Sequence, residues 1–230
     1  MRLIVTLLTI VLTASAKSPK KMDRVTPQTA GDYFQAADYA MEAENFDAAE
    51  RIAREGQAAF PHAIGFHLLL GDILVERHKT ADAFYEYQWE VLRTGADRPI
   101  GREAQMKAGN LVVDGRGTDA DELRTIIAAV QQMATEPAKS ADTLERYASR
   151  RANVFVLRVL FAEALAKSKQ DAEAAAAFRE LIKRDPFFVP AYVDLGELLL
   201  RTGKEPEGKA LVAKAREIDP DHWRLKPPKN

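Results

Sequence analysis

Apolar residues recur three or four positions apart along most of the chain, as on the buried face of an amphipathic helix. Residues 189–220 show this pattern twice: a first helical segment runs up to Gly203, and a second one ends at a proline. Pro186 ends a similar pair of segments 34 residues before that proline. The pattern therefore predicts paired helices over residues 154–220, and the same frame fits residues 30–95. A period of this length is typical of repeats that consist of two helices.

Small residues occupy the positions at which the two helices of a predicted pair cross. Ala37 and Ala49 take these positions in the first unit, and Gly71 takes one of them in the second. A glycine inside a helix costs about 1 kcal/mol relative to alanine, so a close approach of two helices is the expected reason for its presence. We therefore interpret Gly71 and Gly196 as packing glycines.

The last two units carry large and small residues in the order of a known repeat. One unit contains Phe161-Ala162, Leu165, Ala174, Phe178 and Pro186. The next contains Tyr192, Leu195-Gly196, Leu199, Ala215 and Pro220, and it departs from the order at Gly208, where alanine is usual. This order resembles the tetratricopeptide repeat (TPR) family. The resemblance implies an all-α fold, an α-solenoid of helix-turn-helix TPR units that forms a right-handed superhelix, with two units in residues 30–95 and two in residues 154–220.

Residues 96–153 do not follow the frame. Helical spacing predicts helices over residues 101–113 and 119–133, which we interpret as a degenerate third repeat. Pro137 is expected to break the chain, and Ser140 to be the N-cap of an additional helix that either ends or fuses with the first helix of the following repeat. Residues 221–230 follow the last unit as a C-terminal tail.

The N-terminus has the three parts of a secretory signal. Arg2 supplies positive charge, residues 3–13 form a short apolar segment, and Ala14-Ser15-Ala16 fits an A-x-A cleavage site. We expect residues 1–16 to be removed, residues 17–29 to form a flexible leader, and the mature protein to carry no membrane span. An uncleaved anchor is the alternative. The expected location is the bacterial periplasm or the extracellular medium, which the absence of cysteine suits.

The composition and the motifs point away from catalysis. A net charge of -1 gives no basic field for nucleic acid. The four histidines lack the zinc-protease spacing, and neither a phosphate-binding loop nor a nucleophile elbow is present. We therefore expect no catalytic residues, no metal and no cofactor. The histidines are His62, His67, His78 and His222.

The resemblance to TPR proteins implies a concave groove that the first helix of each pair lines. Its fifth, ninth and twelfth positions project into the groove. At the fifth position stand Phe34, Leu68, Val159 and Val193. At the ninth stand Asp38, Asp72, Glu163 and Glu197, and at the twelfth stand Met41, Val75, Ala166 and Leu200. The Lys, Arg and Asn residues of the TPR clamp for chaperone carboxylates are absent, which argues against that role.

An apolar strip accompanied by acids predicts a protein or peptide partner with Lys or Arg between apolar residues. Alternatively, the acids are only solvated and the apolar residues pack against the middle segment. The leading functional hypothesis is a non-enzymatic interaction scaffold of the cell envelope. The alternatives are an enzyme or enzyme accessory whose site lies in residues 96–153, and a self-assembling structural component.

Overall fold

The computed structural model describes residues 27–114 and 118–226, so the expected signal segment lies outside the described residues. These ranges contain eleven α-helices, one short 3₁₀ helix and no strand. The N-terminal helices are α1 (Ala30–Glu42), α2 (Phe46–Ala59), α3 (Phe66–Glu76) and α4 (Thr80–Thr94). The middle helices are α5 (Pro99–Asp114), α6 (Thr118–Gln132) and α7 (Pro137–Arg150). The C-terminal helices are α8 (Phe155–Lys167), α9 (Asp171–Arg184), α10 (Val189–Arg201), α11 (Glu205–Ile218) and η1 (Trp223–Leu225).

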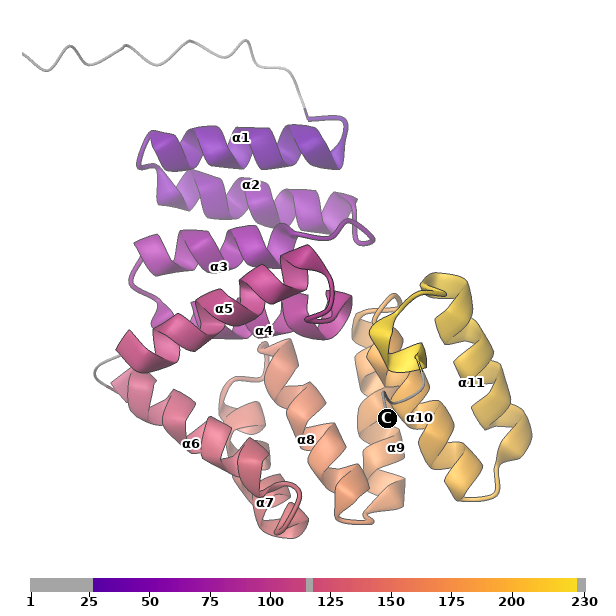
Figure 1. The fold of residues 1–230 in the computed structure, drawn as a ribbon. Helices are drawn as coiled ribbons and strands as arrows, with labels where there is room; N and C mark the ends of the chain where they lie inside the picture. Colours follow the sequence, from indigo (N-terminus) through magenta and orange to yellow (C-terminus); the bar gives the residue numbers. More distant parts are fainter. Residues whose placement is uncertain (1–26, 115–117, 227–230) are drawn as a thin grey trace, which may run out of the picture.

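Successive helices pack antiparallel and form an all-α solenoid of TPR repeats, which Figure 1 shows for α1 to α4 and again for α8 to α11. None of the helices in the described ranges has the length and apolar character needed to cross a bilayer.

The turns inside the four recognisable repeats repeat the same backbone geometry. A residue with positive φ follows the first helix of each pair, at Glu44 (54°), His78 (57°), Lys169 (65°) and Gly203 (81°). The first two and the last two of these residues are each 34 positions apart, as the sequence period predicts. Only Gly203 is of the residue type that adopts this region freely. The turns therefore confirm the frame independently of the pattern of apolar residues.

Gly71 and Gly196 are packing glycines, as expected. A Cβ atom at Gly71 would lie 2.2 Å from the ring of Tyr87. At Gly196 it would lie 2.8 Å from Val212 and 3.0 Å from the backbone oxygen of Gly208. Gly196 and Gly208 thus face each other across α10 and α11. This close crossing explains why Gly208 departs from the family pattern.

The middle segment is helical as expected, but its packing differs from that of a TPR pair. α5 packs along α4 and α6 packs against α7, whereas α5 and α6 make few contacts with one another. The expectation that Ser140 is an N-cap was wrong. Pro137 begins α7, where its missing N–H costs nothing, and the buried Ser140 donates a hydrogen bond of 2.7 Å to the carbonyl of Ala129. α7 and α8 remain separate helices.

α4 is the helix on which the two halves of the protein meet. It packs against α3 and α5 and also against α8, so the C-terminal repeats meet the N-terminal ones at α4 and lie below them in the view of Figure 1. Four rings form a continuous column across this junction. Trp89 of α4 stacks on His67 and on Phe155, with ring centroids 4.1 Å and 4.3 Å apart, and Phe155 meets Phe188 edge-on at 5.0 Å. Aromatic contacts in such geometries stabilise a core beyond the area that they bury.

Candidate protein-binding groove

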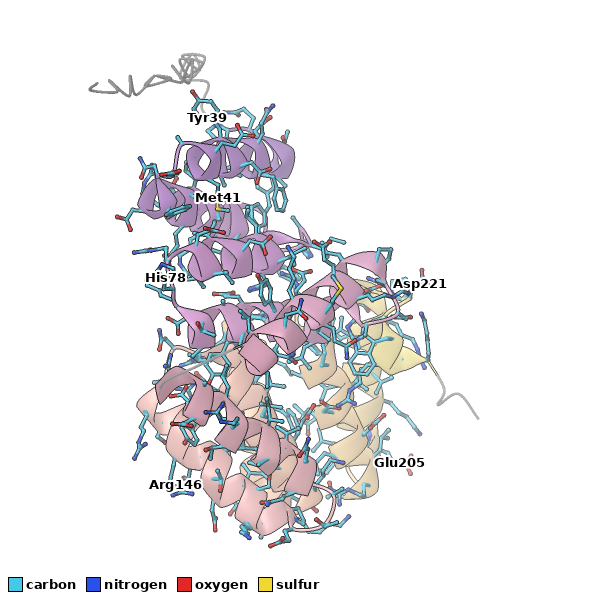
Figure 2. All side chains as sticks on the ribbon, turned by 60° about the vertical axis from the view of Figure 1, so that its left-hand side comes forward. Tyr39, Met41, His78, Arg146, Glu205 and Asp221 are labelled. Atoms are coloured by element: carbon cyan, nitrogen blue, oxygen red, sulfur yellow. The ribbon has the colours of Figure 1, made fainter. Side chains whose placement is uncertain are left out.

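The first helices of the N-terminal pairs, α1 and α3, carry the apolar residues that are predicted to line the groove. Phe34 of α1 stacks on Phe66 with ring centroids 4.2 Å apart. Met41 points from α1 toward α2 and α3 and packs against their apolar cluster (Figure 2). Leu68 and Val75 of α3 are partly buried against the main core. All four side chains are partly buried, so each keeps part of its area exposed to solvent.

The corresponding residues of the C-terminal repeats are more deeply placed. Val159 is 1% exposed and Val193 is 3% exposed, so both belong to the hydrophobic core and do not reach the surface. The described part of the C-terminal tail, residues 221–226, is called the C-terminal segment below. Its Leu225 packs against the cluster that contains Val193. Ala166 is partly buried, while Leu200 at the end of α10 remains exposed.

Asp38 and Asp72 are neighbours on the inner face of the N-terminal repeats. Asp38 is exposed, and the partial desolvation of its carboxyl, followed by the charges of Glu42 and Asp72, raises its pKa. Asp72 accepts hydrogen bonds from Tyr87 at 2.7 Å and from Lys107 of α5 at 2.8 Å. The second of the predicted groove acids therefore already holds a cation of the same chain.

Glu163 holds a second cation, which comes from the C-terminal segment. Nη2 of Arg224 lies 3.2 Å from Oε1 of Glu163 and 2.6 Å from Oδ1 of Asp194. Burial, and then the neighbouring Asp194, raises the pKa of Glu163 to about 7, although Arg224 opposes this shift. Burial also raises the pKa of Asp194. Two carboxylates, one each from α8 and α10, and the guanidinium of Arg224 thus form a partly buried cluster.

A cavity of about 360 Å³ adjoins this cluster. Its lining combines acids and bases with apolar side chains: Glu163, Ala166, Lys167, Phe178, Asp194, Glu197, Leu198, Arg201 and Arg224. Glu197 is exposed at its edge. The predicted groove residues of the C-terminal repeats, apart from the two buried valines and Leu200, therefore converge on one hollow.

The C-terminal tail is packed onto the repeats, which the sequence did not reveal. Nε1 of Trp223 donates to the carbonyl of Leu92 at 3.2 Å, and the ring of His222 hydrogen bonds to the carbonyl of Arg93 at 3.0 Å. Lys226 forms an ion pair of 3.0 Å with Asp97. Figure 1 shows η1 lying across α10 toward the corner between α4 and α5. The signal that could have suggested this docking is a tryptophan that follows the last repeat.

The buried histidines His67 and His222 serve packing and hydrogen bonding. His67 is buried in the aromatic column, with its Nδ1 2.7 Å from Oε2 of Glu86. Within the part of the chain that the structure describes, no three His, Asp or Glu side chains converge as metal ligands.

A family model described as tetratricopeptide repeat matches residues 34–110 and 159–222, which is more than half of the chain. Its first match extends into α5, and the unmatched stretch between the two contains α6 and α7. No curated protein sequence matches the chain.

Several solved structures are similar. YrrB, described as a TPR protein with an unusual peptide-binding site, is 17% identical with a TM-score of 0.42, over 85% of this chain and 89% of its own. MamA from Desulfovibrio magneticus RS-1 is 13% identical with a TM-score of 0.36, over 85% and 98%. The TPR domain of P58(IPK) is 11% identical with a TM-score of 0.40, over 85% and 62%. By the match of the family model, the chain belongs to the tetratricopeptide repeat family.

Proposed function

We propose that the protein is a non-enzymatic protein–protein interaction module whose concave groove holds a partner segment with Lys or Arg between apolar residues. The observation that carries this proposal is the docked C-terminal segment. It places Arg224 between Trp223 and Leu225, and the arginine contacts the predicted groove acid Glu163. The chain's own segment therefore has the chemistry that the groove residues predict for a partner.

Two further groove acids are available to such a partner. Asp38 and Glu197 are exposed, and neither forms an ion pair with another of the described residues. Exposed ion pairs contribute only about 0–1 kcal/mol each. Apolar contacts must therefore supply most of the affinity, while the acids select the sign of the partner's charge and speed the encounter.

Reversing the charge of both exposed acids tests this proposal. The probe is a set of fluorescent peptides with fixed apolar positions and with Lys, Arg or Glu between them. Asp38→Lys combined with Glu197→Lys is expected to weaken binding of the basic peptides and to reverse its salt dependence, because the added lysines repel them. Titrations at several ionic strengths measure both effects.

Two control variants separate charge from apolar contact. Glu205→Lys combined with Glu207→Lys adds the same charge in the first turn of α11, away from Tyr39 of α1 (Figure 2), and is expected to bind like the wild type. Leu68→Ala shortens a partly exposed apolar side chain that is predicted to line the groove, and it is expected to weaken binding without a change in the salt slope. If the charge-reversed protein binds basic and acidic peptides as the wild type does, the groove acids do not contact the partner.

We further propose that the protein acts in the cell envelope after export. The support is the apolar segment that precedes Ala14-Ser15-Ala16. Mass spectrometry of the protein from its native host is expected to find an N-terminus at Lys17. An intact Met1 in the mature pool would contradict export with cleavage.

A further inference from the structure

Arg224 fits its two carboxylates incompletely. A single nitrogen, Nη2, serves both Glu163 and Asp194. Nε of Arg224 and Oδ2 of Asp194 are buried, and neither has a hydrogen-bond partner among the described residues. A guanidinium and a carboxylate can instead pair through two parallel hydrogen bonds. Oδ2 of Asp194 is thus an acceptor that Arg224 does not use, and Nε of Arg224 is an unused donor.

The space beside Arg224 allows a different approach of a guanidinium. The cavity of about 360 Å³ opens next to it and is lined by the apolar side chains of Phe178 and Leu198 together with charged residues. Arg224 enters from one edge of this cavity, because its backbone is fixed at the end of α4 by Trp223 and His222. This anchor restricts the angles at which Arg224 can meet Asp194.

The C-terminal segment is covalently linked to α11, and this link compensates for the incomplete fit of Arg224 to Glu163 and Asp194. The segment follows α11 within a few residues, so it competes with any free ligand at a high effective concentration. The guanidinium of Arg224 also lies 5.2 Å from the ring centroid of its neighbour Trp223. A cation beside an aromatic face is favourable when both are partly desolvated.

We propose that Glu163 and Asp194 form an arginine-binding subsite of the groove. In the free protein Arg224 fills it, and in the complex an arginine that stands beside an aromatic residue of a partner protein replaces Arg224. This inference rests on the proposed function, since it assigns one position of the partner segment. Binding of the partner then releases the C-terminal segment from the groove.

The test uses the full chain and a synthetic fluorescent peptide with the sequence of residues 219–226. A second peptide carries citrulline, the neutral isostere of arginine, in place of the arginine. Arg224→Ala empties the subsite, and Trp223→Ala removes the anchor that holds Arg224 there. Both variants are expected to bind the arginine peptide about tenfold or more tightly than the wild type, because the tethered competitor is lost. Citrulline is expected to abolish this gain.

A matched control and a fold check accompany the titrations. Arg216→Ala removes an exposed arginine of α11 and is expected to bind the peptide like the wild type. Circular dichroism establishes that each variant is folded. If Arg224→Ala leaves two unpaired carboxylates that prevent folding, Trp223→Ala alone carries the comparison, because it retains the arginine.

Three results would overturn the inference. The first is equal affinity of the wild type and both variants for the arginine peptide, and the second is equal binding of the citrulline peptide. The third is a concentration-dependent dimer of the wild type that Arg224→Ala abolishes, which would assign the subsite to the C-terminal segment of a second copy. If the subsite fails while Asp38→Lys alone still weakens binding of the basic peptides, the proposed function stands without it.

Discussion

Phe155→Ala is expected to lower the free energy of unfolding by about 3–5 kcal/mol, the range for truncating a buried phenylalanine. Phe155 is 4% exposed and stands at the centre of the aromatic column. Its ring is nearly parallel to that of Trp89, at an interplanar angle of 7°, and perpendicular to that of Phe188, at 89°. The substitution opens a cavity between α4 and α8, so the two halves lose an apolar contact at the centre of their junction.

Urea unfolding followed by circular dichroism measures this effect. Met106→Ala on α5 is the matched control, because its side chain is 61% exposed and its loss is expected to leave the midpoint unchanged. The Phe155→Ala variant is also expected to unfold in two steps, since its halves no longer support one another. A single transition with an unchanged midpoint would show that the aromatic column does not join them.

Acidification is expected to release the C-terminal segment. Burial of the His222 ring lowers its pKa from 6.5 to about 4, although its hydrogen bond to the carbonyl of Arg93 and the charge of Asp219 oppose this shift. The nearby Arg98 adds to the lowering. An undocked His222 takes up a proton near its ordinary pKa, whereas a docked His222 resists protonation. The contribution of neutral His222 to the free energy of docking is therefore full above pH 6.5 and is lost as the pH falls toward 4. The shift corresponds to roughly 3 kcal/mol, or about a hundredfold in the docking equilibrium.

Glu163 acts on docking in the same direction, at higher pH. Burial and Asp194 raise its pKa to about 7, while Arg224 and then Lys167 act in the opposite direction. Protonation of Glu163 removes the negative charge that attracts Arg224 and therefore weakens docking. His222→Gln retains a hydrogen-bond donor but does not titrate. Comparison of this variant with the wild type therefore isolates the part of the response that His222 causes between pH 6.5 and 4.

Incorporation of 5-fluorotryptophan followed by ¹⁹F NMR measures the release. Trp223 reports on the segment, and Trp89, held between His67 and Phe155, is the internal reference. The Trp223 signal of the wild type is expected to shift on acidification while that of Trp89 does not. His222→Gln is expected to retain only the part of this shift that protonation of Glu163 causes, and to lose the further shift between pH 6.5 and 4. If His222→Gln responds to pH as the wild type does, His222 does not control docking.

The repeat frame predicts contacts between neighbours in the sequence, and there it succeeds. It gave the paired helices of the first and last units and identified the packing glycines Gly71 and Gly196 from a single residue type in a helix interior. It failed at the start of α7, because a proline followed by a serine fits both a break before an N-cap and a proline in the first turn. The backbone around Pro137 decides between them only once α7 packs on α6 and α8.

The groove could be predicted only as a list of positions. The period indicates which residues face inward, but it contains no information on what covers them. Val193 is buried partly because Leu225, outside the repeats, packs against its cluster. Arg224 and Trp223 belong to no pattern, so their contacts with α8, α10 and α4 appear only in the folded chain. Docking of the C-terminal segment depends on the three-dimensional arrangement of α4, α8 and α10, which the 34-residue repeat pattern does not contain.

The docked C-terminal segment changes how this solenoid must assemble. A linear repeat array gains stability from nearest neighbours and can fold outward from any unit. Here His222 meets the backbone of Arg93 across 129 positions of the chain, and Trp223 meets that of Leu92 across 131. Such distant contacts raise the contact order and slow folding. During synthesis the N-terminal repeats can form early, but the contacts that join α4 to η1 form only after residues 222–225 have been synthesised.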